Sequence, residues 1–279
     1  MTPAYAHEGG NHAAEALGWS FEPWVVWPMF VLAVLYAAGS SRLARRGSAD
    51  RWRSAVLFWA GFATLALALM SPLHAYGTRL FSAHMIEHEI MMIIAVPLMV
   101  AARPGPVLLW GVPHGWRQPL MRLLRGPVLG WAWRAFTELT SATLLHTAVI
   151  WVWHVPSFFE AAVRNEGLHV IQHLSFVVSA AFFWIAVLDR DQRRHGQGAA
   201  VLALFFTSIQ AALLGALLTF STKLWYPDGR DPMELIGMTR SEDQALAGLI
   251  MWIPACSLYV VAALILMARW LMQMDQRHA

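Results

Sequence analysis

Seven stretches of the chain are apolar and long enough to cross a bilayer as helices, which takes about 20 residues each. Short polar segments rich in arginine, glycine or proline separate them. The expected spans are Trp24–Ser40, Ser54–Met70, Thr78–Ala102, Phe136–Trp153, Leu168–Leu188, Ala199–Phe220 and Gln244–Leu271. The pattern therefore predicts an all-α integral membrane protein, a bundle of about seven transmembrane helices.

Proline interrupts the pattern in three places. Pro97 and Pro254 fall inside the third and seventh expected spans, and each is expected to kink its helix. Between the third and fourth spans, residues 103–135 contain five prolines and several tryptophans. No long helix can continue through such spacing, so we expect short helical pieces lying at the membrane interface.

The composition agrees with this interpretation. The hydrophobic fraction is 58% and the charged fraction 13%, about half of the roughly 25% that is usual for soluble domains. A soluble fold of 279 residues could not bury so much apolar surface, so the lipid bilayer must surround it. The basic residues lie in short runs between apolar stretches, so no nucleic-acid partner is expected. The single cysteine, Cys256, excludes an intrachain disulfide and a thiolate-cluster metal site.

The basic residues also predict the orientation. The loops after spans one, three and five, together with the C-terminal end, contain fifteen of the twenty arginines and lysines, and the opposite face contains five. Cytoplasmic loops are the ones enriched in these residues. We therefore expect the N-terminus outside and the C-terminus in the cytoplasm. The chain then divides into an outer tail (1–23), a membrane domain (24–272) and a cytoplasmic tail (273–279).

Most of the twelve histidines fall at the outer face in this topology. Two pairs with i,i+4 spacing open the third and fifth spans, and such a pair lies 40° apart on one helix face, where both imidazoles can reach one ion. Another histidine precedes each pair, at the end of the preceding helix. We expect two three-histidine half-sites that face each other across the bundle, namely His74/His84/His88 and His154/His169/His173.

A lone histidine in an apolar helix is more often a hydrogen-bonded packing residue than a ligand. Ionisable groups inside a membrane are expensive, however, and generally functional, so we interpret the cluster as a metal site. Glu87 and Met91 project from the same helix face as the first pair and are possible additional ligands. His146 lies deeper in its span, where packing and ligation both remain open.

Spacing alone does not choose the metal, because imidazole suits copper, zinc, iron and nickel. The first pair also reads H-x-x-E-H, the inverted zinc-protease pattern with Glu87 as general base. An intramembrane zinc metallopeptidase is therefore an alternative. A haem-binding electron carrier is another, because a single haem can take one ligand from each of two facing helices.

Four stretches of the chain resemble the multi-span CtaG family of bacterial cytochrome c oxidase assembly proteins. Together they run from the start of the third span to the last span. They are Phe81–Pro97 (FSAHMIEHEIMMIIAVP), Trp153–Pro156 (WHVP), Leu168–Phe176 (LHVIQHLSF) and the pair Gly215–Ser221 (GALLTFS) with Glu242–Trp252 (EDQALAGLIMW).

The resemblance implies an assembly factor with no turnover of its own, in the bacterial plasma membrane, that supplies a copper ion to cytochrome c oxidase subunits at the outer face. A periplasmic copper donor is a further possible partner. The motif histidines are expected to hold the metal. One departure concerns Glu87, since the family commonly has an uncharged residue before the second histidine of the first pair. An added carboxylate would make the site more tolerant of Cu(II) or zinc, so it bears on the identity of the metal.

Overall fold

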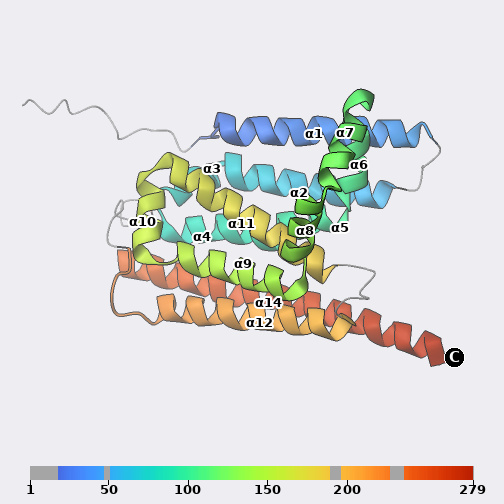
Figure 1. Cartoon of the computed structure of the whole chain (residues 1–279). Coiled ribbons are helices and arrows are strands. Elements are labelled where there is room, and N and C mark those ends of the chain that lie inside the picture. The colour runs from blue at the N-terminus through green and yellow to red at the C-terminus, as the bar shows by residue number, and fades with distance from the viewer. Residues whose placement is uncertain (1–17, 47–50, 189–195, 227–235, 279) are drawn as a thin grey trace, which may run out of the picture.

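A computed structural model describes residues 18–46, 51–188, 196–226 and 236–278, and all regular structure within these ranges is helical. The long helices lie side by side (Figure 1). This confirms the predicted all-α class. The long helices without a break are α1 (Pro23–Ala44), α2 (Trp52–Met70), α11 (Glu166–Val187), α12 (Gly196–Thr219) and α14 (Arg240–His278).

The third span is built from three consecutive pieces. These are α4 (Phe81–Glu89), the π-helix η2 (Ile90–Ala95) and α5 (Val96–Ala101). Pro97 lies in the first turn of α5, so the departure from α-helical geometry falls directly before the proline. A π-helical turn changes the backbone hydrogen-bond pattern. The indole Nε1 of Trp184, in α11, donates a hydrogen bond to the carbonyl of Met92 at 2.9 Å and ties this region to the neighbouring helix.

The fourth span is shorter than the sequence indicated. Helix α9 (Leu139–Trp153) has 15 residues, about 22 Å at 1.5 Å per residue and less than the roughly 30 Å of a bilayer core. Glu138 caps its start by accepting a hydrogen bond from the backbone N–H of Ser141. After α9 the chain bends by 73° into α10 (Pro156–Arg164). In the described residues, six helices are long and apolar enough to span, or seven if this bent pair forms one span.

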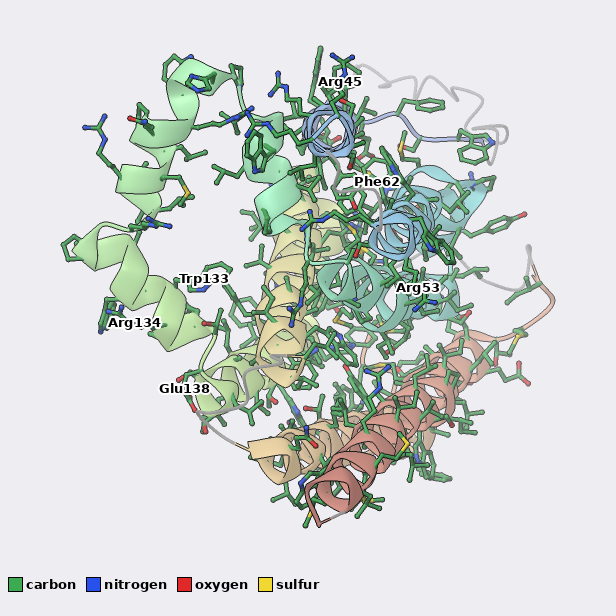
Figure 2. All side chains as sticks on the ribbon, turned by 90° about the vertical axis from the view of Figure 1, so that its right-hand side faces the viewer. Arg45, Arg53, Phe62, Trp133, Arg134 and Glu138 are labelled. Carbon is green, nitrogen blue, oxygen red and sulfur yellow. The ribbon has the colours of Figure 1, made fainter. Side chains whose placement is uncertain are left out.

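The segment at 103–135 forms three short helices, α6 (Pro104–Gly111), α7 (His114–Leu124) and α8 (Pro127–Phe136). Helix α6 packs against α1, where the Arg42 guanidinium donates hydrogen bonds to the carbonyls of Trp110, Gly111 and Val112. Helices α7 and α8 have no buried residues. Figure 2, which looks along the bundle, shows these helices beside it. Their location at the membrane interface remains a prediction.

The two ends of the bundle differ in chemistry. The short helices α3 (Pro72–Gly77) and α10 lie at one end, and the C-terminus lies at the other (Figure 1). Arg45 follows the end of α1 and Arg53 lies at the start of α2, and both of these helix ends point toward the C-terminal end of the bundle (Figure 1). The fold therefore gathers arginines at one end, as the loop analysis indicated. That this end faces the cytoplasm remains a prediction of the positive-inside rule.

Helices α12 and α14 approach each other closely through glycine. A Cβ atom on Gly248 would lie 2.6 Å from the carbonyl oxygen of Gly215. Replacing Gly248 by leucine is therefore expected to force the helices apart and to destabilise the protein by about 1–3 kcal/mol. Thermal unfolding in detergent measures the effect. The control is Leu249→Ala, at a neighbouring position that is 37% exposed and away from this contact; an equal loss in both variants would contradict the packing argument.

Candidate metal centre

Helix α4, which carries the first histidine pair, is anchored at its start by a carboxylate from α14. The backbone N–H of Phe81 donates to Asp243 Oδ2 at 2.7 Å, and that of Ser82 donates to Oδ1 at 3.2 Å. A carboxylate at this position accepts the unpaired N–H groups of the first turn and opposes the helix dipole. Glu242 and Asp243 both lie in the first turn of α14. Glu242 does cap that helix through Thr239, whereas Asp243 reaches α4.

Loss of this anchor is expected to loosen the helix that carries the histidines. Asp243 is 3% exposed, and replacing a capping residue by alanine typically costs about 1–2 kcal/mol. Asp243→Ala is therefore expected to lower the thermal stability in detergent by that amount. Glu242→Ala, which removes a cap from the exposed end of α14 only, should have a smaller effect. The reverse order would show that the contact to α4 does not stabilise the fold.

The two i,i+4 pairs face each other across α4 and α11, as expected from the sequence. The ring centroids of His84 and His169 are 5.5 Å apart, and those of His88 and His173 are 5.1 Å apart. From α3, the ring of His74 lies 5.5 Å from His169 and 5.8 Å from His173. Five imidazoles from three helices therefore form one group, which we call the histidine cluster.

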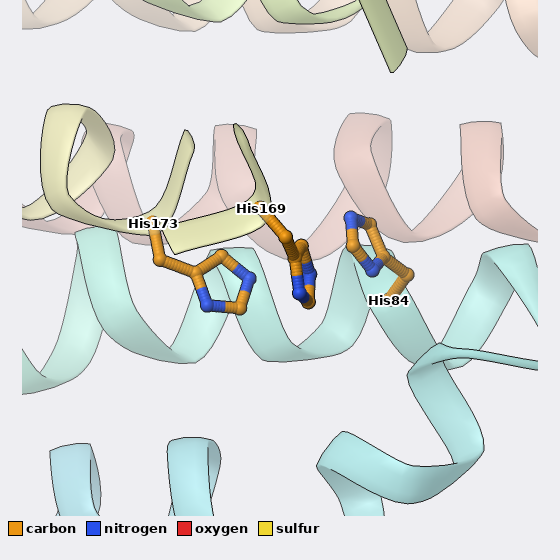
Figure 3. Close-up of side chains that lie close together, drawn as sticks. All are labelled: His84, His169 and His173. Carbon is orange, nitrogen blue, oxygen red and sulfur yellow. The ribbon is translucent and has the colours of Figure 1, made fainter. Parts of the chain in front are cut away.

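Two sets of donor atoms in and beside this cluster have the spacing of a metal site. His84, His169 and His173 each offer a ring nitrogen within 4.8 Å of the others, and Figure 3 shows their rings between α4 and α11. We call them the three-histidine group. His74, Glu87 and His173 satisfy the same criterion and form the mixed group. Because His173 belongs to both, the two groups adjoin each other.

Several donor atoms in and beside the cluster are buried without a hydrogen-bond partner. His84 Nε2, His173 Nε2, both ring nitrogens of His88 and Glu87 Oε2 have no hydrogen bond among the described residues. His84 and His88 are only 2% and 1% exposed. Leaving a buried polar group unsatisfied costs about 1–3 kcal/mol. Imidazole nitrogens and a carboxylate are suitable ligands for a transition-metal ion, so this donor set fits such an ion.

His74 lies between two carboxylates at the edge of the cluster. Its Nδ1 lies 2.8 Å from Glu87 Oε1, and its Nε2 lies 3.6 Å from Glu22 Oε1. Burial by itself lowers the pKa of His74, but the hydrogen bond and charge of Glu87, with a contribution from Glu22, raise it above its usual value. His74 therefore retains a proton more readily than an ordinary histidine, and an ion that enters the mixed group must displace this proton.

His154 lies on another flank of α4, away from the ring contacts that join the five cluster histidines. It caps α9 just before the bend, and its Nδ1 donates a hydrogen bond to the carbonyl of Ile150 at 2.7 Å, which turns the ring back along α9. Its Nε2 lies 3.4 Å from the sulfur of Met85. The structure therefore does not assemble His154, His169 and His173 as a separate half-site; two of them join His74, His84 and His88.

The other possible ligands from the sequence lie in different surroundings. Met91 is in η2, and the change from α- to π-helix at this point alters the face that it presents. It packs in an apolar cluster with Met29, Leu65, Ala68 and Ala95. Met85, which the helix-face argument did not select, does lie next to a histidine: its sulfur is 3.4 Å from Nε2 of His154.

His146 is fully buried and has polar neighbours of its own. Its Nδ1 is 3.1 Å from Ser179 Oγ, its Nε2 is 3.4 Å from the hydroxyl of Tyr259, and its ring stacks on Phe183 at 5.3 Å. These contacts are those of a hydrogen-bonded packing residue.

Comparison with known protein families finds a match over most of the chain. The family model described as cytochrome c oxidase caa3 assembly factor (Caa3_CtaG) matches residues 34–273, a range that contains the whole histidine cluster. Uncharacterized proteins of Mycobacterium bovis and Mycobacterium tuberculosis are each 29% identical over 214 residues, 73% of this chain and 32% of the relative. One of Mycobacterium leprae is 24% identical over 271 residues, 94% of this chain and 40% of the relative.

The chain thus spans between about a third and two fifths of the length of these curated relatives. No solved structure matches it.

Proposed function

Because the family model covers residues 34–273, the chain belongs to the Caa3_CtaG family of cytochrome c oxidase caa3 assembly factors, and we propose that it supplies copper to that oxidase through its histidine cluster. The observation that carries the proposal is the convergence of buried, unpartnered imidazole nitrogens from α4 and α11. A bound ion would remove the penalty of leaving these nitrogens unsatisfied.

The parts of the chain that carry the cluster, namely α3, α4 and the start of α11, lie at the end of the bundle opposite the C-terminal end (Figure 1). Under the positive-inside rule this is the outer face, where we place copper capture and release. The acceptor is an oxidase subunit. The ion comes from a copper-binding protein or from free copper in the periplasm, on the outer side of the bacterial plasma membrane. The protein carries out no chemical turnover in this scheme, since the copper is its cargo.

Release requires a site that does not enclose the ion completely. Among the members of the three-histidine group, His169 is only partly buried, whereas His84 is 2% exposed. An acceptor ligand can therefore reach the ion from the His169 side.

The shared histidine connects the two groups of donor atoms. His173 belongs to both groups, so an ion can exchange His84 and His169 for His74 and Glu87 without leaving His173. We infer that the two groups are successive positions of one ion along the transfer path.

Metal binding should depend on pH with a defined sign. Neutral imidazole is the ligating form, and its unperturbed pKa is about 6.5. Copper affinity in the mixed group is therefore expected to fall as the pH drops from 7.5 to 5, because the ion must displace the proton of His74, whose pKa is raised above its usual value; below that pKa the fall is about tenfold per pH unit for this one imidazole. Competition with a chelator of known affinity at each pH measures this. An affinity that is constant over the range would contradict ligation by His74, whose raised pKa requires it to lose a proton before it binds the ion.

Two other functions use the same residues. An intramembrane zinc metallopeptidase is compatible with the buried, unpartnered Oε2 of Glu87 in the HxxEH segment. A haem carrier would use one histidine from each facing pair. Elemental analysis and an absorption spectrum of one detergent preparation separate the three: copper supports the carrier, zinc supports the peptidase, and a Soret band supports haem.

A further inference from the structure

We propose that Met85 and His154 form a second copper site, selective for Cu(I), on the flank of α4 next to the histidine cluster. The inference rests on the proposed copper function and assigns it a second position and an oxidation state. The sulfur of Met85 and Nε2 of His154 are 3.4 Å apart. Met85 is 1% exposed and His154 is 3% exposed.

The hydrogen bond to Ile150 fixes which nitrogen of His154 is free. A carbonyl oxygen only accepts, so Nδ1 must carry the hydrogen in the 2.7 Å contact. In the neutral ring, Nε2 then has a lone pair, and it faces a thioether sulfur that has no hydrogen to give. Two electron-pair donors in a buried site therefore face each other, an arrangement that a soft cation would satisfy. Histidine ligands are commonly oriented by a backbone carbonyl at the other nitrogen.

The separation of the two donor atoms fits one shared ion. With metal–nitrogen and metal–sulfur bonds of about 2.0 and 2.3 Å, donors 3.4 Å apart subtend roughly 105° at the ion. This is close to the tetrahedral angle, so Met85 and His154 can bind one ion without a change of backbone.

The surroundings favour Cu(I) over Cu(II). Thioether sulfur is a soft ligand that selects Cu(I). Met85 belongs to the main apolar cluster of the bundle, together with Phe159 and Tyr226, whose rings lie 4.4 Å apart. In such apolar surroundings the loss of water costs the singly charged ion less than the doubly charged one.

Two contacts connect this position to the rest of the protein. The hydroxyl of Tyr226, kept protonated because burial raises its pKa, donates to the carbonyl of His154 at 2.8 Å and anchors that residue. The second connection is the backbone, since Met85 follows His84 of the histidine cluster directly in the chain. A copper ion can therefore pass around α4 from imidazole ligands to a mixed sulfur and nitrogen site.

The test compares the purified protein in detergent with Met85→Leu, a substitution that nearly conserves volume. Under anaerobic, reducing conditions, competition with a Cu(I) chelator is expected to show at least about tenfold weaker Cu(I) binding in the variant. X-ray absorption of the Cu(I) form should show a sulfur ligand at about 2.3 Å that the variant lacks. Zn²⁺ binding, which reports the histidine cluster, should not change. The control is Met92→Leu, at a buried methionine in η2. Its Cu(I) affinity and its sulfur signal should equal those of the unmodified protein.

The outcomes distinguish this site from the proposed function. If Met85→Leu keeps both the Cu(I) affinity and the sulfur signal while Zn²⁺ still binds, the Met85–His154 site is refuted and the histidine cluster stands. If the unmodified protein binds neither Zn²⁺ nor copper, the proposed function and this inference both fail. Unchanged Zn²⁺ binding in the variant also shows that the fold around α4 is intact.

Discussion

Replacing His173 by alanine is expected to weaken copper binding by more than about 100-fold, because even loss of a residue that only supports a metal ligand costs 10- to 100-fold. His173 is the one residue that the three-histidine group and the mixed group share. Its Nε2 is buried, has no hydrogen-bond partner among the described residues, and lies 3.9 Å from Glu87 Oε1. The substitution therefore removes a ligand from both positions of the ion, whereas the loss of His84 or His74 affects only one.

The matched control for His173→Ala is His146→Gln. His146 is also a buried histidine in a membrane helix, but it contacts Ser179 and Tyr259 instead of the cluster. The glutamine keeps a polar group there, and copper affinity should remain that of the unmodified protein. Chelator competition and the copper content after dialysis provide the measurements. Equal affinity in His173→Ala and the unmodified protein would remove the cluster from consideration as the copper site.

Local periodicity was sufficient to predict the centre of this cluster. Residues four apart on a helix share a face wherever the helix is regular, and both pairs lie in regular α-helix. The topology then brought both pairs to the same end of the bundle. The facing of His84 with His169 and of His88 with His173 therefore followed from spacing and span order.

The parts that could not be predicted depend on departures from regular helix and on distant contacts. The π-helical turns at Ile90–Ala95 altered the face that carries Met91. The end of α9 turned His154 back to Ile150, so that it met Met85. The anchor from Asp243 to Phe81 joins residues 162 positions apart, and no local pattern encodes it. Each of these features follows from tertiary packing, which periodicity does not contain.

Glu87→Gln is expected to slow copper transfer by roughly tenfold while copper capture is retained. The amide preserves the shape of the side chain, but it removes the negative charge from the mixed group. The three-histidine group does not contain Glu87 and should still bind the ion. Without the carboxylate, the interactions that raise the pKa of His74 are largely lost, so this pKa should fall. Transfer to a purified, copper-free subunit of the oxidase, followed by stopped-flow absorbance, measures the rate.

Glu22→Gln is the matched control, since Glu22 also approaches His74, at the longer distance of 3.6 Å, and lies outside both groups of donor atoms. Its effect on the transfer rate should be smaller because it removes a neighbouring charge but no ligand. The same pair of variants tests the peptidase alternative, in which Glu87→Gln abolishes a proteolytic activity while zinc remains bound. If Glu87→Gln transfers copper as fast as the unmodified protein, the ion does not pass through the mixed group. It would then have to leave the three-histidine group directly from the side of His169.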